Sequence, residues 1–325
     1  MSERAVSIAF QTDKPLAAYG PLAAAAESFG FDGVSVFNDM LYQPAWLPLL
    51  EIARATSRVR IGPAAVNPFT CHPINIAASI ALIDEASQGR AYLGFARGAW
   101  LDAVGLEPPK PVTALREAML AVRHLLRRST EPLAGEIFSL AGGDALRWDA
   151  IRSDIPFLLG SWGPRMIREG LELVDEIKLG GTANPDAASW LRAQTGDSPV
   201  RLVVGAVTVV DEDGAAARAR AKREVALYLP VVAELGPRLA IEPEVLAGVR
   251  AAAAIYDYDA AARFISDELL RRIAFAGTPN DVAGQALELF AAGVDRVEFG
   301  TPHGLSTQEG VRLLGERVLP ALRQE

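Results

Sequence analysis

A strand–helix–strand unit lies between Ile61 and Gly98, and similar units recur along the chain. Its sequence, IGPAAVNPFTCHPINIAASIALIDEASQGRAYLGFARG, has two short apolar runs on either side of an amphipathic helical pattern. Two strands joined by a helix are parallel, because the chain must cross over before the second strand begins. The loops after both runs are rich in small residues and leave room for a ligand.

Eight such apolar runs predict eight strands. They are Val6–Phe10, Gly33–Phe37, Arg60–Pro63, Arg90–Phe95, Ile155–Leu159, Glu176–Leu179, Arg201–Val210 and Asp295–Phe299. Helical patterns lie between them at Pro15–Phe29, Ile74–Ala86, Val112–Leu126, Pro164–Leu173, Pro185–Gln194 and Pro279–Ala292. Eight alternating units predict a closed (β/α)8 TIM barrel, and the lack of a glycine fingerprint after the first strand disfavours an open dinucleotide-binding sheet.

Two segments are longer than the repeat requires. Arg128–Asp154 is interpreted as an irregular or hairpin excursion before the fifth strand. Ala215–Arg272 is Ala-rich and helical in pattern, and it precedes the eighth strand. We expect this insertion to cover the ligand site, to form a subunit interface or to pack as extra helices. No linker divides the pattern, so residues 1–325 are predicted to form one barrel domain.

Composition narrows the choice of partners. The formal net charge of −8 disfavours nucleic acid and anionic membrane, which leaves a small molecule as the expected ligand. The first residues, MSERAVSIAFQTD, contain no long apolar stretch, and no segment reaches about 18 uninterrupted apolar residues. The single cysteine, Cys71, cannot form an internal disulfide. A cytoplasmic location is therefore expected.

Barrel enzymes carry their active sites at the C-terminal ends of the strands, here called the mouth. The candidate residues directly after the strands are Gln11, Thr12, Asn38, Asp39, Met40, Ala64, Ala65, Asn67, Arg97, Trp100, Gly160–Gly163, Lys178–Thr182 and His303. Asp39, Arg97 and His303 are the candidate catalytic residues. The histidines follow no metal-ligand spacing, and no G-x-S-x-G motif occurs, so neither a metal site nor acyl transfer is predicted.

Glycines follow the fifth and sixth strands. The segments Leu159–Pro164 (LGSWGP) and Leu179–Thr182 (LGGT) place unhindered backbone next to helix starts, an arrangement that suits a phosphate. The alternative is that these glycines only end strands and turn the chain. The spacing of the glycines does not decide between these two interpretations.

Several segments together resemble the luciferase-like flavin and deazaflavin oxidoreductases. They are GFDGVSVFNDM, VNPFTCHP, IALIDEASQGRAYLGFARGAW, KPVTALREAM, LLGSWGPRMIREG and AGTPNDVAGQALELFAAGVDRVEFGTPHG. They cover almost the whole chain, and the branch that they resemble is the coenzyme F-420-dependent methylenetetrahydromethanopterin reductases. The resemblance implies a (β/α)8 barrel, usually a homodimer, and a deazaflavin cofactor.

The resemblance also implies roles for individual residues. Ala64 and Ala65 match a bulge with a non-prolyl cis peptide that presses on the cofactor ring, and Asn67 could touch the polar edge of that ring. Arg97 and Trp100 match positions that line the ring and the substrate pocket. The remaining matches would hold the cofactor side chain and phosphate, and they are Gly160, Ser161, Trp162, Gly163, Gly180, Gly181 and Thr182.

Two positions depart from the reductase pattern. Met40 stands where relatives carry histidine, and Ala9 stands where several carry glutamate. Four residues therefore stay candidates for the donor of a proton to the substrate, namely Asp39, Arg97, Gln11 and His303.

Three activities follow from these sequence features. The first is hydride transfer between coenzyme F-420 and a small organic substrate. The second is an FMN-dependent monooxygenase with a partner flavin reductase. The third is a lyase that uses Lys178 as a Schiff-base amine.

Overall fold

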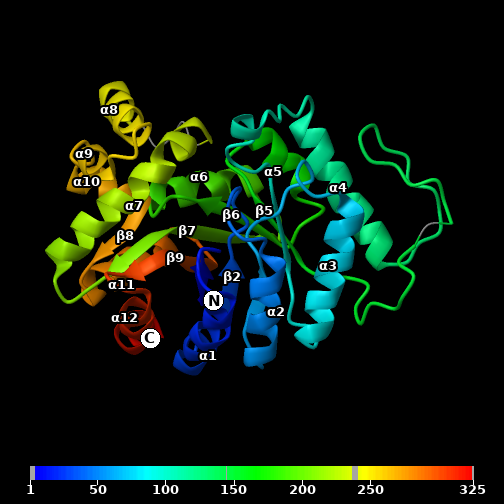
Figure 1. Ribbon diagram of the computed structural model, residues 1–325, viewed down its shortest axis with the longest axis horizontal. Helices are drawn as coiled ribbons and strands as arrows, with labels where there is room; N and C mark the ends of the chain where they lie inside the picture. The colour runs from blue at the N-terminus through cyan, green and yellow to red at the C-terminus, as the bar shows by residue number, and fades with distance from the viewer. Residues whose placement is uncertain (1–3, 144, 236–240, 324–325) are drawn as a thin grey trace.

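Eight parallel strands form the predicted barrel, and a ninth strand lies beside it (Figure 1). The computed structural model describes residues 4–143, 145–235 and 241–323. The strands are β1 (Ala5–Phe10), β2 (Gly33–Val36), β3 (Arg60–Pro63), β4 (Leu93–Ala96), β5 (Phe157–Gly160), β6 (Glu176–Gly180), β7 (Arg201–Val210), β8 (Ala274–Gly277) and β9 (Arg296–Gly304). Their order around the sheet is β3-β2-β1-β9-β7-β6-β5-β4, with β8 paired to β7.

The barrel closes between β3 and β4. Isolated parallel bridges join Ile61 to Ala91 and Val66 to Phe95. The two strands approach so closely that a Cβ on Gly94 would lie 2.3 Å from the carbonyl oxygen of Pro63. Glycine is therefore required at this seam.

Helices surround the barrel. They are α1 (Tyr19–Phe29), α2 (Trp46–Ala55), α3 (Pro73–Ala86), α4 (Pro111–Leu126), α5 (Pro164–Gly170), α6 (Pro185–Thr195), α7 (Gly214–Leu235), α8 (Pro243–Ala253), α9 (Tyr258–Ala262), α10 (Asp267–Ile273), α11 (Pro279–Ala291), α12 (Thr307–Leu313) and α13 (Leu319–Arg323). Proline at the first turn of α3, α4, α5, α6, α8 and α11 fixes a backbone angle that a helix start favours. The predicted alternation of strands and helices is confirmed.

The two insertions differ in structure. Residues 128–143 and 145–154 belong to an irregular segment with an antiparallel bridge between Leu133 and Leu140, and Figure 1 shows most of this segment at the edge of the molecule, away from the strands. The second insertion forms α7, α8, α9 and α10 in its described part. Figure 1 shows α7 running alongside β7 and β8 toward the middle of the molecule.

The sequence prediction missed β8 and ended the last strand too early. Ala274–Gly277 pairs with the outer half of β7, at Val207–Val210. β9 continues past Phe299 to Gly304 and pairs with the same part of β7. β7, β8 and β9 therefore extend beyond the rim of the other strands.

Charged side chains occupy the interior of the barrel. Glu176, Lys178, Arg296 and Glu298 lie on β6 and β9 and are almost completely buried. Arg296 lies 2.6 Å from Glu176 and 3.1 Å from Glu298, and Lys178 forms an ion pair with Glu298. The two acidic and two basic side chains neutralise one another, because a buried charge without a partner is strongly destabilising.

Glu27 at the end of α1 holds the segment that enters β3. Its carboxylate accepts backbone hydrogen bonds from Ser57, Arg58 and Val59. Burial alone would raise the pKa of Glu27, but these N–H groups lower it to about 2 from its ordinary value of 4.5. The carboxylate therefore stabilises the fold above pH 4.5, and this contribution is lost as the pH falls from 4.5 toward 2.

We expect Glu27→Gln to lower the free energy of unfolding by about 2 kcal/mol at pH 7, because charge-assisted hydrogen bonds are lost. Urea unfolding at pH 7 and pH 3 measures this effect. The difference between variant and parent should shrink at pH 3, and a difference that does not depend on pH would contradict the assignment.

Candidate active site at the barrel mouth

Gln11 is the centre of a polar cluster at the mouth. It follows β1, and its Nε2 donates to Asp39 Oδ2 at 2.8 Å and to the Tyr228 hydroxyl at 3.1 Å. Its Oε1 accepts the backbone N–H of Thr12 at 2.8 Å. Since that N–H can only donate, the orientation of the amide is determined. The end of β1, the loop after β2 and helix α7 therefore meet at one side chain.

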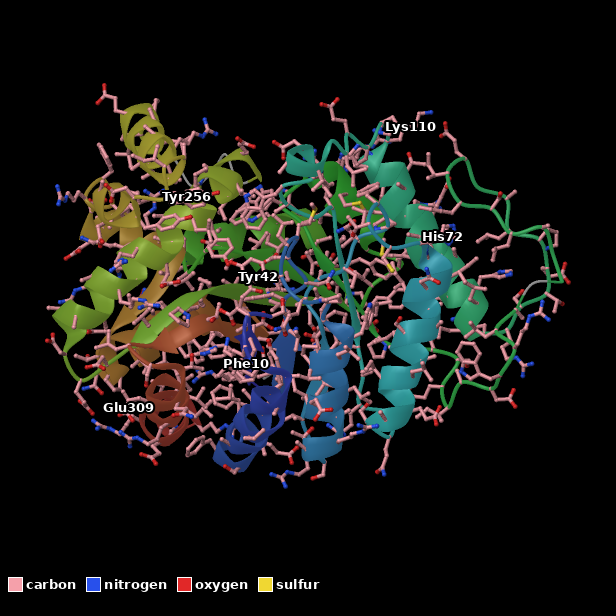
Figure 2. The ribbon with its side chains drawn as sticks, viewed as in Figure 1. Phe10, Tyr42, His72, Lys110, Tyr256 and Glu309 are labelled. Atoms are coloured by element: carbon pink, nitrogen blue, oxygen red, sulfur yellow. The ribbon has the colours of Figure 1, made fainter. Side chains whose placement is uncertain are left out.

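The carboxyl group of Asp39 is shielded from water. Burial raises the pKa of Asp39 above its ordinary value, and the Gln11 hydrogen bond and the charge of Lys178 offset only part of this effect. Burial and the charge of Asp39 also raise the pKa of Tyr42, which lies just before α2 near the middle of the molecule (Figure 2). A carboxyl group with a raised pKa can hold a proton closer to neutral pH.

Arg97 and Trp100 follow β4, as predicted. The Trp100 ring lies 5.8 Å from the Tyr228 ring, centroid to centroid, so the loop after β4 also meets α7. Arg97 is exposed and has no ion-pair partner within the described part of the chain. It is therefore a free cation at the mouth.

The loop after β3 contains the cis peptide that the resemblance implied, between Ala64 and Ala65. Asn67 is buried and turned into its own loop. Its Oδ1 accepts from the backbone N–H groups of Phe69 and Thr70, at 3.0 and 2.9 Å. The side-chain oxygen of Asn67 thus shapes the loop, and contact with a ring through this atom is not supported.

The glycine loops after β5 and β6 lie side by side. The indole Nε1 of Trp162 donates to the carbonyl oxygen of Gly180 at 3.0 Å, and its ring stacks on Trp190 with 6.2 Å between centroids. In the first loop, the Ser161 hydroxyl accepts the N–H of Gly163 at 3.1 Å. The two loops are therefore held as one unit.

The loop after β6 has fewer unpaired hydrogen-bond donors than its glycine-rich sequence suggests. The N–H of Gly181 donates to Gly205 at 2.8 Å, and the Thr182 hydroxyl donates to the backbone of Arg272 at 3.0 Å. The Thr182 N–H also faces the Gly205 carbonyl, at 3.4 Å. The sequence predicted backbone in this loop that could bind a phosphate. At Gly181 and Thr182 this expectation is wrong, because their N–H groups already face the Gly205 carbonyl of β7.

The same loops contain open space. A Cβ built on Gly180 meets no heavy atom of the described residues within 4 Å, and one on Gly160 meets its first neighbour, Ala96 Cβ, at 3.5 Å. Protein packing does not require glycine at either position. This observation fits a ligand that approaches the backbone closely.

His303 was predicted at the mouth, but the structure buries it completely. It lies within β9, its ring packs edge-on against Phe10 at 5.3 Å, and its Nε2 is 3.0 Å from the Ala9 carbonyl oxygen. Burial and the charge of Lys14 lower the pKa of His303 to about 3. A neutral, inaccessible imidazole does not serve as a proton donor to a ligand.

Lys178 is also buried, in an ion pair with Glu298, and its Nζ lies 5.4 Å from the centre of the Phe37 ring. This ion pair holds the amine inside the barrel, where a carbonyl substrate at the mouth cannot reach it. The structure therefore argues against the Schiff-base lyase.

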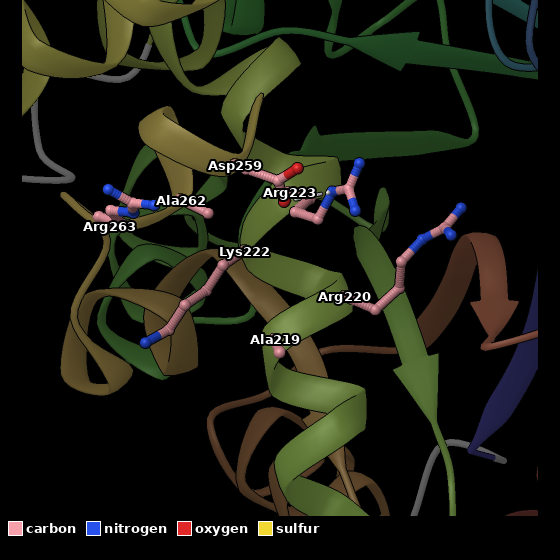
Figure 3. Close-up of a pocket in the computed structure, with 7 residues that line it drawn as sticks. All are labelled: Ala219, Arg220, Lys222, Arg223, Asp259, Ala262 and Arg263. Atoms are coloured by element: carbon pink, nitrogen blue, oxygen red, sulfur yellow. Dashed lines mark ion pairs between the residues drawn. The ribbon is translucent and has the colours of Figure 1, made fainter. Parts of the chain in front are cut away.

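Two grooves lie away from the Gln11 cluster. One, of about 440 Å³, runs between α7 and α9 and is lined by Ala219, Arg220, Lys222, Arg223, Asp259, Ala262 and Arg263 (Figure 3). Three of its cations are already paired: Arg223 with Asp259, Lys222 with Asp267 and Arg220 with Glu224. The other, of about 1020 Å³, includes Asp175 and Arg201 and lies at the opposite end of the barrel.

The described residues contain no cluster of three or more His, Cys, Asp or Glu side chains arranged to hold a metal ion. Within the same residues, no helix has the length and apolar character needed to cross a membrane.

The fold and the loops at the mouth define a class of barrel oxidoreductases. The family model described as luciferase-like monooxygenase matches residues 5–296, and the chain belongs to this family. The 5,10-methylenetetrahydromethanopterin reductase of Methanolobus tindarius is 26% identical over 324 residues, which cover 96% of this chain and 98% of that protein. The corresponding enzyme of Archaeoglobus fulgidus is 28% identical over 92% of this chain and 93% of its own length.

A solved structure has the same fold. The coenzyme F-420-dependent tetrahydromethanopterin reductase of Methanopyrus kandleri superposes with a TM-score of 0.88 at 24% identity, over 99% of this chain and 100% of that one.

Proposed function

We propose that this chain transfers a hydride between coenzyme F-420 and a small organic substrate bound at the mouth. The observation that carries the proposal is the open space beside Gly160 and Gly180, on two loops that Trp162 ties together. The full-length similarity to methylenetetrahydromethanopterin reductases supports the choice of cofactor. A deazaflavin supplies a carbon atom that gives or accepts a hydride when it is bound.

The residues at the mouth fit such a cofactor. The loop Gly160–Gly163 and the backbone of Gly180 would hold its side chain and phosphate, and the free cation of Arg97 would neutralise negative charge. Trp100 would lie against the ring, and Ala64 and Ala65 would form its other wall. Asp39, held by Gln11, would supply or accept the proton that accompanies hydride transfer to the substrate.

The substrate proposed for the first assay is 5,10-methylenetetrahydromethanopterin, which the names of the relatives suggest. Anaerobic assays with reduced F-420 should show oxidation of the cofactor that depends on the substrate. Consumption of oxygen with reduced FMN and a flavin reductase, in place of this reaction, would favour the monooxygenase. The homodimer and the cytoplasmic location stay predictions.

Gly160→Val tests the proposal that the Gly160–Gly163 loop holds the cofactor. The added isopropyl group would fill the space beside Ala96, and Gly160 has no positive φ that would oppose the substitution. Overpacking of about 1–3 kcal/mol should weaken F-420 binding by about 10- to 100-fold, with little change in the melting temperature.

Fluorescence titration measures the dissociation constant of F-420. Gly284→Val in α11 is the control for the same substitution at a glycine in the surrounding helices, because a Cβ there meets no described atom within 4 Å. Unchanged F-420 affinity in folded Gly160→Val would contradict the placement of the cofactor.

A further inference from the structure

Gln11 connects Asp39 to helix α7, which belongs to the insertion and not to the barrel repeat. Its Nε2 donates one hydrogen to Asp39 Oδ2 at 2.8 Å and the other to the Tyr228 hydroxyl at 3.1 Å. The Tyr228 hydroxyl donates in turn to Tyr42, which lies three residues after Asp39. A chain of hydrogen bonds therefore leaves the loop after β2 at Asp39, passes through Gln11 and α7, and returns to the same loop.

The amide of Gln11 has one orientation that satisfies all of its contacts. Its Oε1 accepts the Thr12 N–H at 2.8 Å, and the Thr12 hydroxyl lies 3.3 Å away from the same atom. Both residues are buried. A flipped amide would turn Nε2 toward the Thr12 N–H, where two donors would meet, and Oε1 toward the carboxyl of Asp39. Nε2 is therefore held toward Asp39 and Tyr228.

Packing holds α7 above the mouth. Val225 and Leu229, on either side of Tyr228 along the helix, are buried. One turn further on, Val232 lies so close to the loop after β6 that a Cβ on Gly181 would meet its side chain at 2.6 Å. Gly181 also has a φ of +75°, which favours glycine. The Tyr228 hydroxyl therefore has a fixed position relative to the strands of the barrel.

The two oxygens of the Asp39 carboxyl group have different surroundings. Oδ2 accepts from Gln11, whereas no donor of the described residues reaches Oδ1. The ionisable side chains that face this carboxyl are Lys178 on β6, Tyr228 on α7 and Tyr42 on its own loop. Burial and the charge of Asp39 raise the pKa of both phenols, so both stay neutral. Oδ1 thus keeps its lone pairs for a ligand.

We propose that Gln11 is a positioning residue for proton exchange at Asp39, because it holds Oδ2, leaves Oδ1 to the substrate and links this carboxyl group to α7. The inference rests on the proposed function, and it assigns the reacting oxygen and the part that the insertion plays. When the substrate is reduced, the proton passes from Asp39 Oδ1 to the substrate, and the carboxyl group becomes a carboxylate. Gln11 only donates hydrogen bonds and exchanges no proton.

Gln11→Met removes both N–H donors and keeps a side chain of similar length. We expect the pKa of Asp39 to rise by about one to two pH units, because a hydrogen bond that favours the carboxylate is lost. The 13C NMR signal of the Asp39 carboxyl, identified by its absence in Asp39→Asn, measures this shift in the protein without ligands. The step in the pH profile of kcat/KM for 5,10-methylenetetrahydromethanopterin should move upward by the same amount.

Gln43→Met is the matched control. Gln43 lies on the same loop as Asp39, its Nε2 donates to the Lys14 carbonyl oxygen at 2.8 Å, and its Oε1 accepts from the Tyr19 hydroxyl at 3.3 Å. The control therefore removes contacts between the loops after β1 and β2 without removing a hydrogen bond to Asp39. The pKa of Asp39 should change less than half as much as in Gln11→Met.

Tyr228→Phe tests the connection to α7. It keeps the ring and removes the acceptor for the second hydrogen of Gln11. We expect a smaller rise in the pKa of Asp39 than in Gln11→Met, and no further rise when the two substitutions are combined, because both act through one side chain. Equal shifts by Tyr228→Phe in the parent and in Gln11→Met would overturn the connection through Gln11.

The outcomes separate this inference from the proposed function. If the parent turns over the pterin, an Asp39 pKa that Gln11→Met leaves unchanged, or that Gln43→Met raises equally, overturns the inference and leaves the function standing. An NMR shift without a matching shift in kcat/KM also overturns it, since Asp39 would not exchange the proton. If the parent binds F-420 without turnover, the NMR titration decides whether Gln11 acts on Asp39. A parent that binds neither F-420 nor FMN overturns both.

Discussion

Glu298→Gln is expected to lower the free energy of unfolding by about 3–5 kcal/mol, because it leaves buried cations without their counter-charge. The Glu298 carboxylate pairs with Lys178 and Arg296 and accepts from Ser7 at 3.2 Å, all inside the barrel. Burial alone would raise the pKa of Glu298, but Lys178 and Arg296 hold it at about 2. The carboxylate thus stabilises the fold above pH 4.5, and this contribution is lost as the pH falls toward 2.

A double variant separates charge balance from packing. Lys178→Met with Glu298→Gln removes one charge of each sign and leaves Arg296 paired with Glu176 at 2.6 Å. We expect the double variant to be more stable than Glu298→Gln alone in urea unfolding at pH 7. Losses that simply add would show that the two residues act independently, and would contradict the balanced cluster.

Asp39→Asn is expected to reduce kcat by about 100- to 1000-fold, the usual contribution of a general acid or base. Asparagine keeps the shape and the acceptor for Gln11 Nε2, which lies 2.8 Å from Oδ2, but it cannot exchange a proton. The F-420 dissociation constant should change little, because Asp39 is proposed to serve the substrate. Asp13→Asn is the control, as Asp13 is a partly exposed carboxylate paired with Lys14.

The pH profile of Asp39→Asn gives a second test. If Asp39 donates the proton, kcat of the parent falls as the pH rises through the raised pKa of Asp39, and the variant lacks this step. A variant with full activity would exclude Asp39 and return the choice of donor to water or another group at the mouth.

Local sequence patterns predicted the barrel because each of its strands is a short apolar run that a helix follows. The sequence pattern did not predict β8, because Ala274–Gly277 follows α10 directly and pairs only with the outer half of β7. The same extension explains the error at His303. The strand pattern ended at Phe299, whereas β9 runs on to Gly304 and packs His303 against Phe10.

The sequence predicted the site residues that lie at or after strand ends. It did not predict those that the insertion brings to the mouth. Asp39 and Trp100 follow their strands and Gly160 ends β5, so all three lie at the mouth, as the barrel geometry requires. The position of Tyr228 could not be predicted, because it depends on how α7 packs against the loop after β6. Gly181 in that loop is more than 40 residues away in sequence. The hydrogen bonds of Gly181 and Thr182 with β7 and the backbone of Arg272 are likewise long-range contacts that spacing does not reveal.

The most direct test of the proposed hydride transfer is a fluorescence titration of the purified protein with coenzyme F-420 and, separately, with FMN. We predict a dissociation constant for F-420 in the micromolar range or tighter, and FMN binding at least about tenfold weaker, a difference of roughly 1.4 kcal/mol. A preference for FMN would contradict the deazaflavin assignment and favour the monooxygenase. Binding of neither cofactor would contradict the assignment of the mouth as a cofactor site.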